Sequence, residues 1–374
     1  MPLIDNKPSR HLLFFVVEDW YFVSHRLPLA VAAKNAGYKV TVLTRVRRHG
    51  EIIRSAGLEL VSFEMDRGRI NPLLELVTLL RLSRVYRRLK PDIVHQVAMK
   101  PIIYGSLASL LAGRPKVINA LAGMGWLFTD QRESMLNLLV SSYLKRLLPR
   151  GITIVQNPDD SALITSLGVP RERIRLIAGS GVDLKRFHPT PEPSGPVIVV
   201  CPARLLWDKG VGEFVEAARI LRHRGVEARF VLAGAPDPAN PTSVPSTQVQ
   251  EWVADGLVEA PGWLEDMAAL WTHSHIACLP SHREGLPKAL LEAAACGRPI
   301  VTTDGIGCRE VVRHGVEGLL VPQGNAQALA DSLQRLIEDP ALRQRMGAAA
   351  RTKAEREFGI EKVVEATLRV YTEV

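Results

Sequence analysis

The sequence has little cysteine, and none of it follows a metal-binding or disulfide pattern. The four cysteines, Cys201, Cys278, Cys296 and Cys308, all lie in the C-terminal half, and no two form a CxxC pair. A disulfide framework or a cysteine zinc site needs paired cysteines at characteristic spacings. We therefore expect reduced thiols packed in the interior. The sequence contains no other cluster of metal ligands, so we expect no bound metal.

Long apolar segments are also missing. No run approaches the roughly 20 residues that a membrane-spanning helix needs. The residues before the first apolar run, Leu12–Val17, lack the apolar core of a secretory leader. The sequence shows no zinc finger, RNP motif or other nucleic-acid signature. We therefore expect a cytoplasmic protein with no nucleic-acid partner.

The length and the pattern of apolar runs indicate two domains. The 374 residues exceed what one hydrophobic core usually holds. Strand-like runs alternate with helical segments such as Pro28–Ala36, which is typical of βαβ units with parallel sheets. The pattern restarts at Val197–Cys201, after a segment with four prolines, His188–Pro196. We expect an α/β fold of two doubly wound domains, residues 1–190 and 191–357, with a cleft at the carboxyl ends of the strands.

Positive charge is concentrated in the first half. Residues 1–190 contain 28 lysines and arginines against 15 acids, whereas residues 191–374 contain 19 against 24. This asymmetry predicts contact with an anionic membrane surface or a phosphorylated substrate, and a solvated basic surface is the alternative. Two amphipathic segments, Pro72–Lys90 and Met135–Arg150, have the composition of helices that lie on an anionic bilayer. Alternatively, each packs on its own sheet, with basic residues at the end that the helix dipole favours.

The strongest chemical signal is a loop that enters a helix, His282–Glu292. Gly285 permits an unusual turn and Pro287 suits the first helical position, where free N–H groups can bind phosphate. Glu284 lies in the loop, and Glu292 lies about two turns further along. Carboxylates accept hydrogen bonds from vicinal hydroxyls, so the two acids can hold polyhydroxyl groups at either end of a diphosphate. Solvated helix charges are the alternative, but Glu292 stands in an apolar run and must have a partner.

A second loop supplies positive charge. Arg204, Lys209 and Gly210 follow the first strand of the second domain and precede a helix. Arginine offers a fork of donors and lysine a point charge, and both suit a diphosphate. The pattern predicts a diphosphate site, with a salt-bridged surface loop as the alternative.

Glu284 and Glu292, with seven residues between them, resemble the paired-glutamate motif of the retaining GT-B glycosyltransferases of family GT4. The resemblance implies two Rossmann-like domains facing across a cleft and a terminal helix, 358–374, that crosses back to the first domain. It implies that Glu284 contacts donor sugar hydroxyls and Glu292 the ribose diol. Arg204 and Lys209 would hold the donor diphosphate and stabilise it as it leaves. No cofactor is implied, because the nucleotide sugar is a substrate.

The resemblance extends to other donor contacts. Gly234 and Trp263 fall in segments that enclose the nucleobase, which we expect to be uracil. Glu310 matches the family's acid in the loop after the next strand, while the nearby Cys308 shows no sign of activation as a nucleophile. The loop and helix start complete the donor set: Gly285, Leu286, Pro287 and Lys288.

The first domain carries the expected acceptor site. Its loop Glu18–Arg26 lacks the Gly-Gly pair that many family members place near the donor phosphates. The segments Asp92–Gly105 and Asn119–Thr129 resemble a branch that extends sugars on polyprenyl-diphosphate carriers, often from N-acetylhexosamine donors. This implies a catalytic His95 near the donor sugar, with a core histidine at a strand end as the alternative. Arg26 and Lys100 are candidates for the acceptor diphosphate, and the full acceptor set is His25, Arg26, Lys100, Gly123 and Gly125.

The sequence thus predicts a metal-independent, retaining glycosyltransferase of surface polysaccharide or glycan biosynthesis. It would move a sugar from a UDP-sugar to a membrane lipid-diphosphate-linked sugar at the inner face of the plasma membrane. Members of the family are usually described as reacting on the front face, where the donor phosphate accepts the acceptor's proton. The alternatives are transfer to a soluble acceptor, a UDP-sugar epimerase of similar two-domain fold, and a non-catalytic nucleotide-sugar-binding protein.

Overall fold

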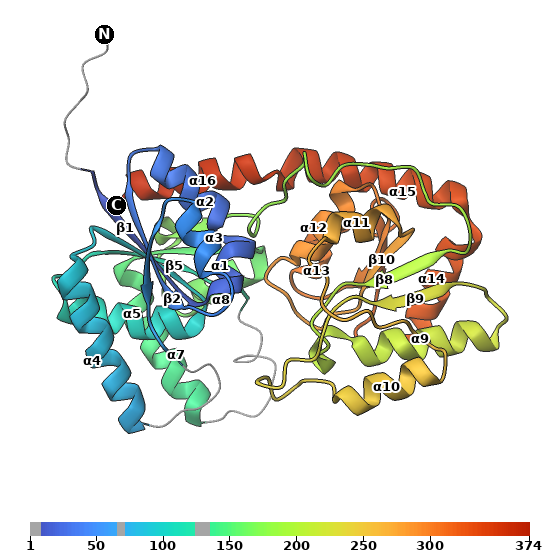
Figure 1. The fold of residues 1–374 in the computed structure, drawn as a ribbon, viewed down its shortest axis with the longest axis horizontal. Helices are drawn as coiled ribbons and strands as arrows, with labels where there is room; N and C mark the ends of the chain where they lie inside the picture. The colour runs from blue at the N-terminus through green and yellow to red at the C-terminus, as the bar shows by residue number, and fades with distance from the viewer. Residues whose placement is uncertain (1–8, 66–71, 124–134) are drawn as a thin grey trace, which may run out of the picture. The chain divides into compact units, whose positions relative to one another are not determined.

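The computed structural model describes residues 9–65, 72–123 and 135–374. The chain divides into two compact units (Figure 1). Unit 1 comprises Met1–Ile177 and Val364–Val374, and unit 2 comprises Ala178–Val363. The last helix, α16 (Ile360–Thr372), therefore begins in unit 2 and ends in unit 1.

Unit 1 is a parallel sheet covered by helices on both faces. Its strands are nearly continuous apolar runs, as in the buried LLFFV of β1 (His11–Glu18), because a parallel sheet between two helical layers has no solvated face. In the described residues, the strand order is β3-β2-β1-β4-β5-β6-β7. The other strands are β2 (Lys39–Arg45), β3 (Glu59–Ser62), β4 (Ile93–Val97), β5 (Lys116–Ala120), β6 (Ile152–Val155) and β7 (Ile174–Leu176).

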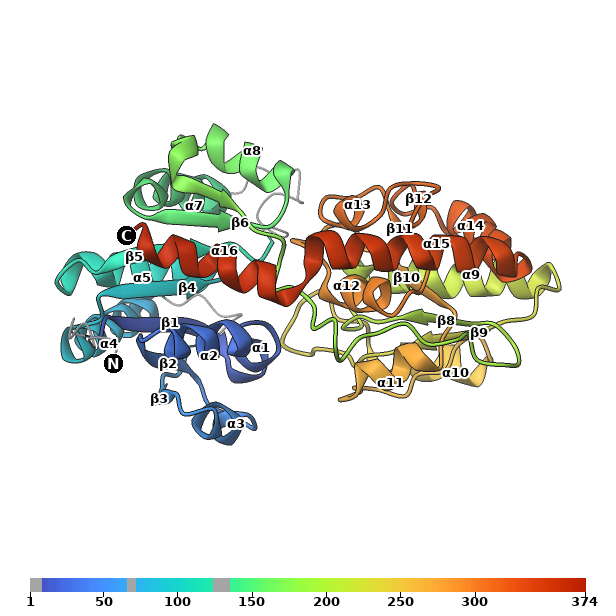
Figure 2. The same ribbon diagram turned by 90° about the horizontal axis from the view of Figure 1, so that it is seen from above.

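The helices of unit 1 form two layers (Figures 1 and 2). Helices α4, α5 and α7 lie on one face of the sheet, and α1, α2 and α16 lie on the other. The helices are α1 (Asp19–His25), α2 (Leu27–Asn35), α3 (Gly50–Ser55), α4 (Pro72–Leu89), α5 (Met99–Leu111), α7 (Met135–Leu147) and α8 (Pro158–Ser166).

Unit 2 repeats this architecture with a parallel sheet in the order β12-β11-β10-β8-β9. Its strands are β8 (Ile198–Cys201), β9 (Arg229–Leu232), β10 (Ile276–Leu279), β11 (Ile300–Thr303) and β12 (Gly318–Val321). Its helices are α9 (Val211–His223), α10 (Ser246–Ala254), α11 (Met267–Thr272), α12 (Lys288–Ala295), α13 (Cys308–Val311), α14 (Ala326–Glu338) and α15 (Pro340–Lys353).

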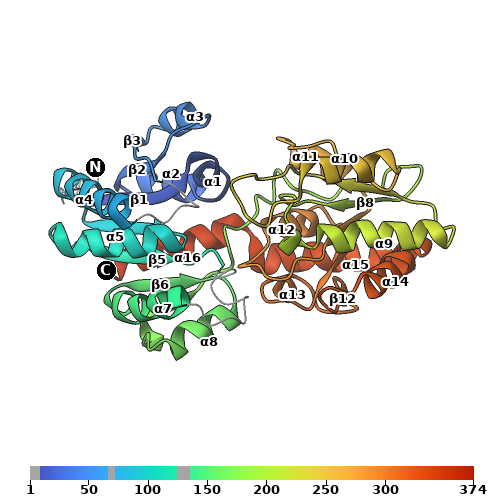
Figure 3. The ribbon, with the colours of Figure 1, turned by 90° about the horizontal axis from the view of Figure 1, so that it is seen from below.

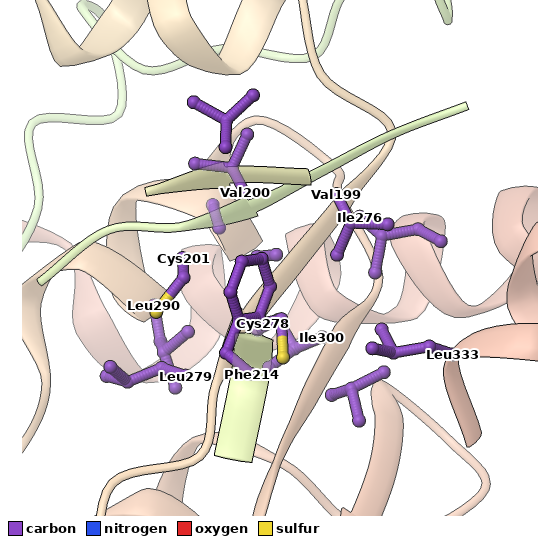
Figure 4. Packing of buried hydrophobic residues seen from close by; sticks show 14 of the residues in the cluster. Val199, Val200, Cys201, Phe214, Ile276, Cys278, Leu279, Leu290, Ile300 and Leu333 are labelled. Carbon is purple, nitrogen blue, oxygen red and sulfur yellow. The ribbon is translucent and has the colours of Figure 1, made fainter. Parts of the chain in front are cut away.

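The core of unit 2 forms between the central strands and their helices (Figure 4). One core cluster contains Val200 and Cys201 of β8, Cys278 of β10, Phe214 of α9 and Leu290 of α12, and all five are inaccessible to solvent. All four cysteines are buried and unpaired, which confirms the prediction of packed thiols. Burial raises the pKa of the Cys201 thiol to about 12, so the thiol is neutral at physiological pH.

The strand order of unit 2 reverses between β8 and β10. The chain runs from β8 to β9 on one side and from β10 to β11 and β12 on the other. The loops that leave the carboxyl ends of β8 and β10 therefore diverge at this point. In open α/β sheets such a switch point leaves a crevice in which ligands bind.

The break between the units falls at residue 177, whereas the prolines had placed it near 190. The intervening segment packs on unit 2. Val182 N donates to Phe358 O at 2.9 Å, and the Phe187 ring is buried in the core cluster of unit 2. Prolines mark an irregular segment, and the side-chain contacts of that segment decide which unit it joins.

Candidate active site

Two loops of unit 2 bring a cation and an anion together at the switch point. After β8, a 3-10 turn ends at Lys209, and Gly210 follows with φ 72°. A Cβ at Gly210 would lie 2.1 Å from the carbonyl oxygen of Pro280, so only glycine lets the loop approach the end of β10 this closely. The Lys209 ammonium then lies 2.7 Å from Oε1 of Glu284, and both side chains are mostly buried.

The loop that carries Glu284 is fixed by its neighbour after β11. The N–H of Glu284 donates to Ile306 O at 2.9 Å. Gly307 has φ 79°, and a Cβ there would lie 2.3 Å from the Glu284 carbonyl oxygen. The Gly-rich turn after β11 thus provides the close backbone contact that sets the position of Glu284.

His282 ties three segments together beside this pair. Its N–H donates to Asp208 O at 3.0 Å, and its carbonyl accepts from Gln323 Nε2 at 2.8 Å. Its Nε2 lies 3.1 Å from Oε1 of Glu213, in the first turn of α9. The hydrogen bond to Glu213 is the main reason that the pKa of His282 is raised above 6.5. The sequence motif contained His282, but its pattern gave no sign of these contacts.

Glu292 is a buried carboxylate in an apolar helix. Its side chain is 7% exposed, among the alanines and leucines of α12, and burial raises its pKa. The apolar run required a partner for Glu292, and the structure shows that this partner is Lys288, one helical turn earlier. The Nζ atom of Lys288 lies 3.4 Å from Oε1 of Glu292. Pro287 is the residue directly before the helix, one position ahead of the first helical position that the motif predicted for it. Burying a carboxylate in an apolar helix lowers the stability of the ligand-free protein. Its presence there therefore points to a functional role.

Arg204 is held by a residue that sequence reasoning missed. One guanidinium nitrogen lies 2.8 Å from Oδ2 of Asp237. Asp237 belongs to the segment 235–245, which we call the strap because its backbone bonds to that of residues 205–207. At its start, a Cβ on Gly234 would lie 1.8 Å from Ala203 O, so glycine is required there.

The strap also contacts the charged loop through Thr242. Its hydroxyl donates to Oδ1 of Asp208 at 2.7 Å, and its carbonyl accepts from the N–H of Trp207 at 2.8 Å. The strap follows β9, which lies beside β8 in the sheet. A segment that leaves β9 must therefore lie at the carboxyl edge of the sheet, near the loop after β8, and this was the signal in the sequence that could have pointed to the strap. Its prolines and asparagine instead suggest a plain turn.

The remaining donor candidates belong to other loops and helix starts of unit 2. Trp263 is 62% exposed, while Leu286 is buried against Gly179. The carbonyl of Glu310 accepts from Lys353 Nζ at 2.7 Å. Their roles toward a donor stay predictions. Among the described residues, no three His, Cys, Asp or Glu side chains converge as metal ligands would.

His95 in unit 1 is enclosed by the core. It has no exposed surface, its ring stacks on Phe14 at 5.0 Å, and its Nδ1 lies 2.7 Å from the Tyr371 hydroxyl of α16. Burial lowers the pKa of His95 well below 6.5. This placement matches the alternative of a core histidine, and the expected contact with the donor sugar stays a prediction.

The acceptor candidates fall into different environments. Arg26 is 5% exposed, its Nε has no hydrogen-bond partner, and no carboxylate within the described chain pairs with it. Lys100 is paired with Glu75 at 2.8 Å, and the His25 ring stacks on Tyr21 at 4.1 Å. Gly123 has φ 94°. Gly125 lies outside the described residues.

Two family models match the chain. The model "Glycosyl transferase 4-like" matches residues 11–156, and "Glycosyl transferases group 1" matches residues 196–339. Together they account for more than half of the sequence, and each falls on one of the two sheets. The chain is a glycosyltransferase. The match to these family models confirms the resemblance to family GT4 that was based on Glu284 and Glu292.

This glycosyltransferase has relatives of similar length. It is 28% identical over 365 residues to the N,N'-diacetylbacillosaminyl-diphospho-undecaprenol alpha-1,3-N-acetylgalactosaminyltransferase of Campylobacter jejuni, covering 93% of this chain and 95% of that protein. It is 26% identical to the putative glycosyltransferase EpsD of Bacillus subtilis, covering 97% of each.

Solved structures agree on the fold. HepE of Anabaena, in complex with UDP and glucose, superposes with a TM-score of 0.78 at 18% identity, covering 98% of this chain and 100% of that one. Sucrose-phosphate synthase of Thermosynechococcus elongatus gives a TM-score of 0.77 at 21% identity, covering 98% and 99%. The glycosyltransferase therefore has the GT-B fold of two parallel-sheet domains, as the sequence predicted.

Proposed function

We propose that this glycosyltransferase transfers an N-acetylhexosamine, with retention, from a UDP-sugar to a sugar that a diphosphate links to a membrane lipid. The observation that carries the proposal is the Lys209–Glu284 pair, held at the switch point of the unit 2 sheet with Arg204 on the same loop. A diphosphate-linked sugar requires cations for its phosphates and an acceptor for its hydroxyls. The product would serve surface polysaccharide or glycan biosynthesis.

The chemistry needs charge stabilisation more than covalent catalysis. As the bond between sugar and diphosphate breaks, negative charge grows on the departing phosphate oxygen. Lys209 and Arg204 stabilise that charge, and Glu284 orients the sugar through its hydroxyls. The Lys209–Glu284 contact holds both groups in place before reaction. The departing phosphate takes the proton of the attacking hydroxyl, so no protein base and no metal are required.

Two relatives support the choice of substrates. The Anabaena structure contains UDP, which supports a uridine donor. The Campylobacter enzyme is named for transfer of N-acetylgalactosamine to a diphospho-undecaprenol-linked sugar, which supports an N-acetylhexosamine donor and a lipid-linked acceptor. We place Glu292 at the ribose diol because its burial beside Lys288 leaves a carboxylate that needs further hydrogen bonds.

Unit 1 supplies a candidate for the acceptor diphosphate. Arg26 is nearly buried and has no carboxylate partner in the described chain. A buried cation without a counter-ion is costly, and an anionic ligand removes that cost. Lys100 is already neutralised by Glu75, so we rank it after Arg26.

The lipid-linked acceptor places the enzyme at a membrane surface. Within the described part of the chain, no helix combines the length and apolarity of a bilayer span. We propose peripheral contact with an anionic membrane, at the inner face of the plasma membrane, in keeping with the 28 lysines and arginines against 15 acids in residues 1–190.

A donor screen tests the proposed function. The purified full chain is incubated with UDP-N-acetylglucosamine, UDP-N-acetylgalactosamine, UDP-glucose, UDP-galactose or GDP-mannose, with and without a polyprenyl-diphosphate-linked sugar. We expect UDP release that requires both an N-acetylhexosamine donor and the lipid acceptor. NMR of the product should show the donor's anomeric configuration.

Other outcomes of the screen point elsewhere. An isomerised sugar formed from donor alone would indicate an epimerase, and transfer to a soluble glycan alone would replace the lipid acceptor. Activity that is lost in EDTA and restored by Mg²⁺ would overturn metal independence. Release of GDP in place of UDP would correct the choice of nucleotide.

A further inference from the structure

The first half of helix α4 exposes many apolar side chains close together. Its large solvent-exposed hydrophobic residues are Leu73 (76% exposed), Leu74 (64%), Leu76 (54%), Val77 (42%) and Leu80 (40%). Single exposed leucines are common on soluble proteins, whereas a contiguous group marks an interaction surface. We call these five residues the α4 apolar turns.

The second half of α4 packs on the sheet in the ordinary way. Leu82 and Tyr86 are fully buried, in a cluster with Phe15 of β1 and Ala108 of α5. Figure 3 shows α4 lying beside α5. The second half thus anchors the helix, and the apolar turns add nothing to that cluster.

The exposed face of α4 passes from leucine to arginine. Residues four apart share a helix face, so Leu76, Leu80, Arg84 and Arg88 stand in one line. Arg81 and Arg87 flank this line, and the side chains of all four arginines are exposed. The surface therefore has an apolar end and a cationic end along one helix.

The acid of α4 is turned away from this face. Glu75 is the only acidic residue in the helix, and its side chain is 14% exposed. Its Oε1 lies 2.8 Å from Nζ of Lys100 on α5. The outward face of α4 consequently carries four positive charges and no acid of its own.

We propose that α4 docks this glycosyltransferase on an anionic bilayer. The α4 apolar turns enter the boundary between headgroups and acyl chains, and Arg81, Arg84, Arg87 and Arg88 contact lipid phosphates. Helices that lie on membranes combine an apolar surface with basic residues in this way, and arginine stems can extend along the apolar region while their guanidinium groups stay at the phosphates. The inference rests on the proposed function in one respect, since a lipid-linked acceptor brings the enzyme to such a surface.

The charge of this face favours a lipid partner over a second copy of the chain. Self-association through α4 would bring the arginines of both copies into one interface, and α4 supplies no outward acid to balance them. Like charges in a shared interface are unfavourable. A bilayer with anionic headgroups provides both an apolar interior for the α4 apolar turns and negative charge for the arginines.

Vesicle flotation tests the proposal. The full chain is mixed with vesicles of phosphatidylcholine alone or with 30% phosphatidylglycerol, over a range of salt concentrations. We expect binding to the anionic vesicles that weakens as salt rises. The double variant Leu76→Glu/Val77→Glu should reduce the bound fraction roughly tenfold or more, at every salt concentration. The double variant Arg84→Glu/Arg88→Glu should reduce it most at low salt.

Matched variants on α5 and in the segment after α8 separate docking through α4 from general effects. Leu110→Glu/Leu111→Glu changes two exposed leucines of α5, and Arg171→Glu/Arg173→Glu reverses two exposed arginines after α8. Both controls should float like the unmodified chain. Circular dichroism melting of each variant verifies that the protein is folded.

The possible results are separable. Flotation that is unchanged by the α4 variants, or equally lost in the controls, would overturn the proposal. So would an α4-dependent dimer detected by light scattering without lipid. If flotation follows α4 but no UDP-sugar supports transfer, the docking surface stands and the proposed function falls.

Discussion

The ammonium of Lys209 lies 2.7 Å from Oε1 of Glu284, although the two residues are 75 positions apart in the sequence. The loops after β8 and β10 bring them together, and the side chains are only 15% and 17% exposed. Each group fixes the orientation of the other. A cation held in this way is already in place when charge develops on a leaving diphosphate, which is the condition for strong electrostatic catalysis.

Substitution of Lys209 should therefore affect turnover more than folding. We expect Lys209→Ala to lower kcat for UDP release by two or more orders of magnitude, equivalent to about 3 kcal/mol of lost charge stabilisation. The control is Lys185→Ala, which removes an exposed lysine from the same unit and should leave kcat unchanged. Near-normal kinetics in Lys209→Ala would remove Lys209 from the catalytic site.

The residues of this pair could be predicted because their signals are local. A strand, a short loop with glycine, and a helix start identify the carboxyl edge of a parallel sheet, and charged residues in such loops point to a ligand. The partner of Arg204 could not be found in the same way. Asp237 lies 33 residues later in a turn-rich segment, and only the folded strap brings it within 2.8 Å of the guanidinium.

Substitution of Glu292 should have opposite effects on the stability of the protein and on its binding of the donor. We expect Glu292→Gln to keep or raise the melting temperature, by about 1–4 °C, because it removes a buried charge and leaves Lys288 partly in solvent. The same change should raise KM for the UDP-sugar about tenfold, because hydrogen bonds to a charged carboxylate are the stronger ones. Differential scanning fluorimetry and initial rates provide the two measurements.

The control for Glu292 is Glu227→Gln, which changes an exposed acid of unit 2 and should alter neither quantity. A lower melting temperature with an unchanged KM would mean that Glu292 serves the fold, through Lys288, and has no contact with the donor.

The His282–Glu213 contact should make unit 2 sensitive to pH. The pKa of His282 is raised above 6.5 and the pKa of Glu213 is lowered below 4.5, each chiefly by their shared hydrogen bond. The His282 contribution is fully present below pH 6.5 and is lost as pH rises through its raised pKa. The Glu213 contribution is present above pH 4.5 and is lost as pH falls through its lowered pKa. The pair therefore stabilises the fold most between about pH 4.5 and 6.5.

Melting curves of the His282→Gln variant test this pH window. The melting temperature of the unmodified chain should exceed that of the variant by about 1–3 °C at pH 5.5, and the difference should shrink by pH 8.5. The size is modest because the His282 side chain is 36% exposed to screening solvent. A difference that grows with pH would contradict the assignment. His223→Gln, an exposed histidine in the last turn of α9, is the control.

His95 shows where local sequence patterns stop being informative. The sequence predicted His95 at the end of a strand, which fits either a substrate contact or a core residue, whereas the structure places it in the middle of β4. The group that encloses it, Tyr371, lies 276 residues away in the last helix. No property of the strand itself reveals that contact, which depends on α16 ending in unit 1. The same limit applies to α4, whose amphipathic pattern is continuous although only its second half is buried.

The hydrogen bond between His95 and Tyr371 decides between the two roles. Tyr371→Phe keeps the ring but removes the hydroxyl from Nδ1, and Nε2 of the histidine already has no partner. We expect the free energy of unfolding to fall by about 1–2 kcal/mol, because a buried ring nitrogen is left unsatisfied. A core role for the enclosed imidazole predicts that kcat and KM of the folded enzyme stay unchanged. Tyr143→Phe, at a tyrosine that is 48% exposed on α7, should alter neither stability nor rate. A loss of kcat without a loss of stability in Tyr371→Phe would return His95 to the catalytic site.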